Sequence, residues 1–233
     1  MNFYVARQPI LDKNKNLFAY ELLLRDSLDN VFPQNIHDDE ATAKIIEGLE
    51  FNLGLESLTQ GTLAFINFTH DSLINGYPLL LDKEHIMVEV LETAKPNKKL
   101  LAACINLKDK GYSIALDDYE HDSAWKQFFP YVDIIKLDYS LTSEQQFQEI
   151  IAALSSYPDI KLLAEKIETY AEFKHALGIG CEYFQGYFFS RPEVIKTVAF
   201  NPSQVAVINL LAEINKDELN IKKITSIFED EVN

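Results

Sequence analysis

Residues 3–26 read FYVARQPILDKNKNLFAYELLLRD. Two segments rich in aromatic and aliphatic residues, 3–10 and 17–26, flank the polar stretch LDKNKN at residues 11–16. A short polar connection between two apolar segments is typical of a β-hairpin. We therefore expect the first two strands to be antiparallel.

Strand and helix patterns alternate after this hairpin. Six further strands are expected at residues 62–69, 85–92, 112–119, 132–139, 161–168 and 182–189, and helical stretches at residues 38–54, 96–111, 143–157 and 169–180. Strands joined by helical crossovers predict an α/β fold, a TIM-like (β/α) barrel with one antiparallel strand from the N-terminal hairpin. An open doubly wound sheet is the alternative, but no G-x-G-x-x-G turn or P-loop follows the early strands.

The composition indicates an acidic globular protein. The chain has 233 residues, of which 47% are hydrophobic, and its formal net charge is −15. This charge opposes attraction to nucleic acid and to anionic membranes, so we expect neither DNA nor a membrane as a partner. No apolar run approaches the roughly 20 residues of a membrane span and no signal-peptide pattern is present, which predicts a cytoplasmic protein. Cys104 and Cys181 lack CxxC spacing and are expected to be core thiols.

Polar residues interrupt almost every predicted strand. Buried parallel strands normally consist of continuous apolar residues, because a buried carboxylate is costly unless a cation or hydrogen bonds compensate it. The interrupting residues are Glu21, Asn67, Glu89, Asp117, Asp118, Lys136, Glu165 and Gln185. Each one alone is readily explained as a solvated strand end or a satisfied structural group. Because the carboxyl ends of barrel strands converge on one face, their joint occurrence favours a functional site there.

The donor types indicate which ligands such a site would bind. Glu21, Asn67, Glu89 and the pair Asp117-Asp118 offer only oxygen atoms, which suits Mg²⁺ or Mn²⁺ and disfavours structural zinc. Adjacent aspartates can bridge two metals about 3.5–4 Å apart, the arrangement used in phosphodiester hydrolysis. Arg25 lies four residues after Glu21 on the same strand face, where its guanidinium can bind a phosphate. The residues favour a metal-dependent phosphate site.

With these motifs in place, the chain resembles the EAL family of bacterial cyclic-di-GMP phosphodiesterases over nearly all of residues 3–202. The family signature Glu-Ala-Leu-x-Arg is matched by Glu21-Leu22-Leu23-Leu24-Arg25, with leucine in place of the alanine. Further matches follow in family order at Asn67, Glu89 to Glu92, Asp117-Asp118, Lys136, Ala164 to Glu168, Gln185-Gly186-Tyr187 and Ser190-Arg191-Pro192. Singly these motifs are weak, but their order and spacing together are specific.

The resemblance implies a site that opens one phosphodiester of cyclic-di-GMP to give linear pGpG. The residues that would bind the first Mg²⁺ or Mn²⁺ are Glu21, Asn67, Glu89 and Asp117, with Asp118 shared with or turned toward a second ion. Lys136 and Glu165, together with the metal ligand Glu21, would be catalytic, positioning and activating the attacking water. Residues Arg25, Gln185 and Leu23 would contact the substrate.

One departure from the family pattern concerns the loop after the two aspartates. Active members carry an aromatic residue and then a Gly-small-Gly loop, whereas this chain reads Tyr119-Glu120-His121-Asp122. Losing both glycines restricts the backbone, and the new carboxylates add negative charge near the metals. Glu92, which anchors this loop in the family, is present. We expect weak or conditional hydrolysis with ligand and metal binding retained.

The chain also resembles signalling proteins in which an EAL domain precedes a helical HDOD domain. Residues 1–202 would form the barrel, and residues 203–233, which predict two amphipathic helices, would begin a truncated HDOD domain or simply cap the barrel. The family also suggests a homodimer. Two alternatives to an enzyme are a catalytically silent cyclic-di-GMP sensor and a protein-interaction platform that binds neither nucleotide nor metal.

Overall fold

The computed structural model describes residues 2–25, 42, 45–46, 55–120, 122–198, 210–213 and 220–221. The helix expected at residues 38–54, the boundary near residue 202 and the helices expected beyond it lie wholly or mostly outside this part of the chain, and so does His121. Those expectations stay predictions.

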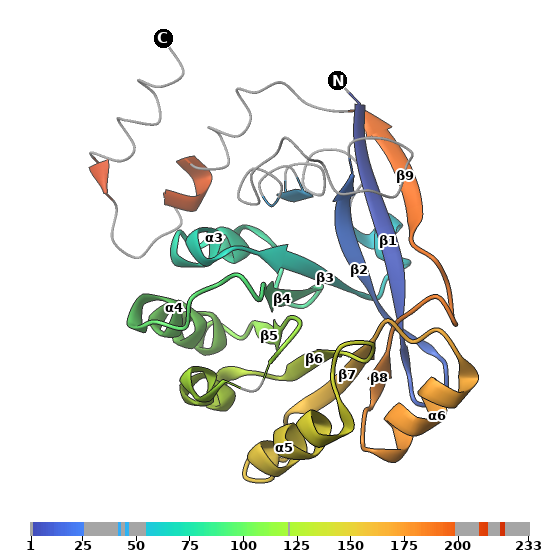
Figure 1. Cartoon of the computed structure of the whole chain (residues 1–233). Helices are drawn as coiled ribbons and strands as arrows, with labels where there is room; N and C mark the ends of the chain where they lie inside the picture. The colour runs from blue at the N-terminus through green and yellow to red at the C-terminus, as the bar shows by residue number, and fades with distance from the viewer. Residues whose placement is uncertain are drawn as a thin grey trace.

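The described strands form one sheet that closes on itself. They are β1 (Asn2–Asp12), β2 (Leu17–Arg25), β3 (Leu63–Phe68), β4 (Ile86–Val90), β5 (Ser113–Leu116), β6 (Ile134–Asp138), β7 (Lys161–Glu165), β8 (Tyr183–Phe184) and β9 (Glu193–Val198). Neighbours from β2 to β8 are parallel, and β1 pairs antiparallel with both β2 and β8 (Figure 1). This topology confirms the TIM-like barrel with one antiparallel strand.

The last part of the barrel differs from the expectation. A single strand was expected over residues 182–189, but β8 ends at Phe184, and the separate strand β9 pairs antiparallel with the first half of β1, from Asn2↔Val198 to Arg7↔Glu193. The chain turns after β8 because Gly186 has φ 153° and the amide of Phe188 donates to the carbonyl of Ile167 (2.9 Å). A glycine and this tertiary hydrogen bond therefore override the aromatic strand pattern.

Helices and 3₁₀ segments cover the outside of the barrel (Figure 1). They are α2 (Leu55–Thr59), α3 (His70–Ile74), η2 (Tyr77–Leu80), α4 (Lys98–Asp109), η3 (Ser123–Tyr131), α5 (Glu144–Leu154) and α6 (Tyr170–Gly178). Capping boxes begin α5 at Ser143 and α6 at Thr169, which explains why both begin close to the positions that the sequence predicts. None of the described helices has the length and apolar character needed to cross a bilayer.

The buried apolar residues of the described part of the chain form two cores. The larger lies between the strands and the helices and includes Cys104 and Cys181. Burial raises the pKa of both thiols to about 12, which agrees with their expected role as unreactive core residues. The smaller core, called the apolar layer here, fills the inside of the barrel and consists of Ile10, Ala19, Phe65, Met87, Ala115, Ile134 and Leu163, each at most 4% exposed.

Candidate active site

A second layer of side chains lies inside the barrel, next to the apolar layer. Side chains alternate between the two faces of a strand, so a residue two positions after an inward-facing residue also points inward. Glu21 follows Ala19 in this way, and Asn67 follows Phe65. The candidate site residues that follow this rule, called the polar layer, are Glu21, Asn67, Glu89, Asp117, Lys136, Glu165 and Gln185. The sequence-predicted polar residues are thus brought together at the carboxyl ends of the strands.

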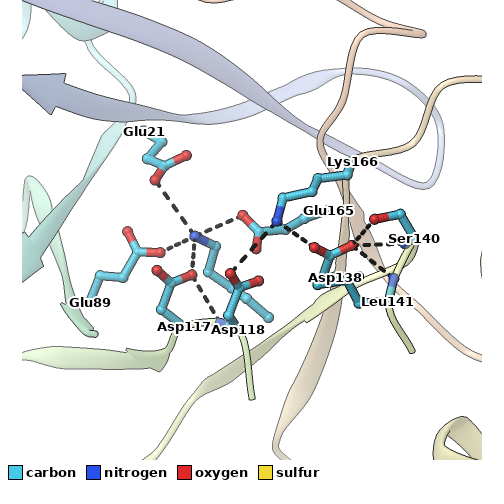
Figure 2. Close-up of polar contacts among 10 residues, drawn as sticks. Glu21, Glu89, Asp117, Asp118, Asp138, Ser140, Leu141, Glu165 and Lys166 are labelled. Atoms are coloured by element: carbon cyan, nitrogen blue, oxygen red, sulfur yellow. Dashed lines mark hydrogen bonds and ion pairs between the residues drawn. The ribbon is translucent and has the colours of Figure 1, made fainter. Parts of the chain in front are cut away.

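The ammonium group of Lys136 lies at the centre of the polar layer and is only 1% exposed. It contacts Glu89 Oε1, donates to Asp117 Oδ1 (2.8 Å) and lies 2.8 Å from Glu165 Oε1. Glu21 Oε1 is 3.7 Å away. Figure 2 shows these carboxylates, from four different strands or strand ends, converging on one point.

The carboxyl groups of this cluster outnumber its one ammonium group. Burial disfavours the charged form of Lys136, but the attraction of Asp117, Glu165, Glu21 and Glu89 outweighs it and raises the pKa of the lysine well above its usual range. Burial also raises the pKa of Glu89 and Glu165 well above that of an ordinary glutamate, despite the opposing charge of Lys136. A further cation would compensate the charge of these carboxyl groups and allow Glu89 and Glu165 to ionise, so the cluster favours binding of a cation.

The polar layer fits a hard divalent ion. In the described part of the chain, four buried oxygens at this site accept no hydrogen bond, namely Asn67 Oδ1, Glu89 Oε2, Asp118 Oδ1 and Gln185 Oε1. Buried polar atoms are rarely left without a partner, so unpaired ones point to a missing ligand or ion. Carboxylate oxygens of Asp117, Asp118 and Glu165 also lie within 4.8 Å of one another. Oxygen-only donors are those that Mg²⁺ and Mn²⁺ prefer.

Two amides position Glu21 within the layer. Gln185 donates to Glu21 Oε2 (2.6 Å), and Asn67 makes a longer contact with Glu21 Oε1 (3.4 Å). Gly186 allows the segment that carries Gln185 to pass close to Ile167, because a Cβ atom at Gly186 would lie 2.1 Å from the carbonyl oxygen of Ile167. Any larger residue at position 186 would therefore displace the chain that carries Gln185.

A cavity of about 460 Å³ opens next to the polar layer, and its volume suits a small-molecule ligand. Arg25, Leu23 and Gln185, the residues expected to contact substrate, all line it. Arg25 Nη1 donates to the carbonyl of Leu24 (2.8 Å), and burial lowers the pKa of the guanidinium, although Glu21 opposes this shift. A desolvated cation beside an acidic cluster is well suited to binding an anionic group.

Glu92, the expected loop anchor, borders the same hollow as the altered loop. It is exposed and lines the hollow of about 500 Å³ together with Tyr119, Glu120 and Asp122, and it also lines a second hollow of about 340 Å³. Its role as an anchor of this loop stays a prediction. In the altered loop, Asp122 accepts from the amide of Ala124 (2.9 Å) and thereby begins η3. Asp122 therefore caps the beginning of η3 at a position where the family pattern has a glycine.

Three residues near the site were not singled out from the sequence. Gln8 pairs with Glu21 across β1 and β2, and Asp138 lies two residues after Lys136 on β6. Both residues could have been predicted, because side chains two positions apart on a strand point to the same side. Lys166 was not predictable in this way, because it lies beyond the end of β7 with a positive φ of 56°.

The EAL domain family matches residues 28–192 of this sequence. The chain belongs to the EAL family. Two relatives match almost the whole chain: "Cyclic di-GMP phosphodiesterase CdgJ" of Vibrio cholerae is 38% identical over 98% of this chain and 53% of its own length, and "Uncharacterized protein YuxH" of Bacillus subtilis is 34% identical over 98% and 57%. This EAL chain therefore spans about half the length of these curated relatives.

Solved EAL structures share the fold. The "calcium/cy-diGMP complex" of BlrP1 from Klebsiella pneumoniae superposes with a TM-score of 0.67 at 22% identity, covering 85% of this chain and 58% of that one. A second structure of BlrP1 is a "manganese/cy-diGMP complex". The eight-stranded barrel with its antiparallel member is therefore the EAL fold, and divalent ions accompany cyclic-di-GMP in that relative.

Proposed function

We propose that this EAL domain binds cyclic-di-GMP in the 460 Å³ cavity together with Mg²⁺ or Mn²⁺, and hydrolyses it to pGpG weakly or conditionally. The observation that carries the proposal is the convergence of four carboxylates on Lys136 beside a cavity that Arg25 lines. The proposal is supported by CdgJ, a relative named as a cyclic-di-GMP phosphodiesterase.

The metal is assigned to the oxygen donors of the polar layer. Glu21, Asn67, Glu89 and Asp117 would hold the first ion, and Asp118 would face a second. The assignment is supported by the unpaired oxygens of Asn67, Glu89 and Asp118. Such ions neutralise negative charge on the phosphoryl oxygens and lower the pKa of bound water.

The protein's own groups supply positioning and proton transfer. Glu165 has a raised pKa because it is buried, and a carboxylate of this kind can accept a proton from the attacking water closer to neutral pH. Lys136 holds Glu89, Asp117 and Glu165 in one arrangement through its contacts. Arg25 would bind a phosphate of the dinucleotide, while Leu23 and Gln185 shape the same cavity.

Product analysis tests the proposed reaction. The wild-type protein is incubated with cyclic-di-GMP and Mn²⁺, and pGpG is quantified by chromatography. We expect slow formation of pGpG, and none with Glu21→Gln, which preserves the size of the side chain but removes its charge. Persistent turnover in Glu21→Gln would show that the proposed site is wrong.

A silent sensor is the second candidate function, and the altered loop Glu120-His121-Asp122 favours it. Calorimetry with cyclic-di-GMP and Mn²⁺ separates the candidates: heat of binding without any pGpG would identify a sensor, and no heat with or without metal would leave an interaction platform. Replacing these three residues by a glycine-bearing loop should raise turnover if the loop limits hydrolysis. A following HDOD domain and a homodimer remain predictions from the family resemblance.

A further inference from the structure

Lys166 lies at the edge of the site with no role in the function proposed so far. It follows Glu165 directly, lines the 460 Å³ cavity, and has a half-exposed side chain. Its φ of 56° is one of four positive values among the described non-glycine residues, and Asp118 has another, 37°. Two unusual backbone conformations therefore bring an ammonium and a carboxylate toward each other from β7 and β5.

The ammonium group of Lys166 is held by a fixed anchor. It contacts Asp138 Oδ2, and the other oxygen of Asp138 accepts from Ser140 N (2.8 Å), Ser140 Oγ (2.6 Å) and Leu141 N (3.2 Å). Asp138 is only 6% exposed and ends β6 (Figure 2). A side chain anchored in this way stays beside the site instead of extending into solvent.

In this position the ammonium group of Lys166 faces Asp118. Its Nζ lies 3.7 Å from Asp118 Oδ2, and Asp118 Oδ1 is buried with no hydrogen-bond partner in the described structure. Asp118 is also one of the three carboxylates whose oxygens lie within 4.8 Å of one another. A divalent ion bound to Asp118 would therefore experience the repulsion of a nearby fixed cation.

We propose that Lys166 acts as a tethered cation that partly takes the place of the second divalent ion: it neutralises Asp118 and weakens the binding of a second ion at the Asp117-Asp118 pair. This role rests on the metal site of the proposed function, and it makes Lys166 a positioning residue rather than a catalytic one. The first ion, assigned to Glu21, Asn67, Glu89 and Asp117, is affected less, because Lys166 lies beside Asp118 and charge repulsion falls with distance.

The test is a Mn²⁺ titration of the intact chain by calorimetry, with the bound ions counted by mass spectrometry after equilibrium dialysis. Lys166→Gly removes the charge, and glycine accepts the positive φ without strain. We expect this variant to bind its second Mn²⁺ about tenfold more tightly than the wild type, the effect of a unit charge on a divalent ion a few ångströms away under water-like screening. Lys166→Arg keeps the charge and should behave as the wild type.

Lys161→Ala is the matched control, because it removes one positive charge from the start of the same strand, where Lys161 pairs with Glu182 (2.9 Å). It should leave both Mn²⁺ affinities unchanged. Equal Mn²⁺ binding by Lys166→Gly and the wild type, including no binding by either, or an equal gain in Lys161→Ala, would overturn the proposal. Cyclic-di-GMP binding and pGpG formation by the wild type are measured separately, so a failure of the proposed function is distinguishable from a failure of this role.

Discussion

The apolar layer and the polar layer inside the barrel are formed by the same strands, at positions two residues apart. Ala19, Phe65 and Met87 belong to the apolar layer, and the residues two positions farther along, Glu21, Asn67 and Glu89, belong to the polar layer. Most side chains of both layers are buried, although Asn67 and Asp117 are partly exposed. The apolar layer is held by packing and the polar layer by the attraction between one ammonium and several carboxylates. A single backbone pattern thus supports both a stable core and a site poised for cations.

The comparison shows that the polar layer depends on the apolar one. The apolar layer fills the barrel next to the polar layer, and the polar layer borders the 460 Å³ cavity on its other side. A low local dielectric strengthens each contact with Lys136 and also makes each unpaired oxygen costly. The two layers should therefore respond differently to mutation and to metal.

The largest effect is expected from opening the apolar layer. Phe65→Ala removes a fully buried ring and should lower the free energy of unfolding by about 4 kcal/mol. Urea denaturation followed by circular dichroism measures this loss, which should be the same with and without Mn²⁺. A loss that Mn²⁺ largely restores would show that the two layers are not energetically distinct.

Removing the central cation of the polar layer should have the next largest effect. Lys136→Met removes the counter-charge of the buried Glu89 and Glu165 and of the partly buried Asp117, and it should cost about 3 kcal/mol of stability in metal-free protein. Because a divalent ion can replace the lost charge, Mn²⁺ should recover a substantial part of this loss in the same urea experiment. The control is Lys161→Met, which removes a half-exposed ammonium and should lower the free energy of unfolding by less than about 1 kcal/mol. Similar losses in both variants would contradict the central role of Lys136.

A smaller effect on stability is expected from Asn67→Ala. Among the described residues, its side chain contacts the rest of the polar layer through one long hydrogen bond to Glu21 (3.4 Å), so its removal should change the free energy of unfolding by less than about 1 kcal/mol. Loss of one neutral oxygen ligand should nevertheless weaken Mn²⁺ binding about tenfold, measured by calorimetry. Unchanged Mn²⁺ affinity would remove Asn67 from the proposed ligand set.

The smallest effect concerns Asp138 and depends on pH. Burial opposes ionisation of Asp138, but hydrogen bonds from Lys166 and Ser140 outweigh it and lower its pKa below 3.8. Because the folded pKa lies below the unfolded value, this stabilisation is present above about pH 4 and is lost as the pH falls through the folded pKa. Asp138→Asn should therefore reduce stability by about 1 kcal/mol at pH 7 and by less near pH 3 in urea titrations. A stability difference between Asp138→Asn and the wild type that does not change with pH would show that it does not arise from the charge of Asp138.

Much of the site could be predicted from the sequence because carboxylates inside apolar strands are rare. The sequence pattern predicted that Glu21, Glu89 and Lys136 lie inside strands, and they lie inside β2, β4 and β6. The hairpin pattern predicted the antiparallel member of the barrel. The pattern was wrong for residues 185–189, where a glycine and a contact with Ile167 turn the aromatic segment away from the sheet. Local propensity does not report such contacts between distant parts of a chain.

The sequence by itself determined which side chains point into the barrel, because alternation along a strand is a local property of the extended backbone. Only the tertiary structure decided that Lys136 lies at the centre of the carboxylates and that Lys166 faces Asp118 across the cavity edge. These positions depend on barrel closure by β1 and on the positive φ angles beyond two strand ends. The stagger between strands and the turns that follow them arise from contacts between residues far apart in sequence, which no single segment encodes.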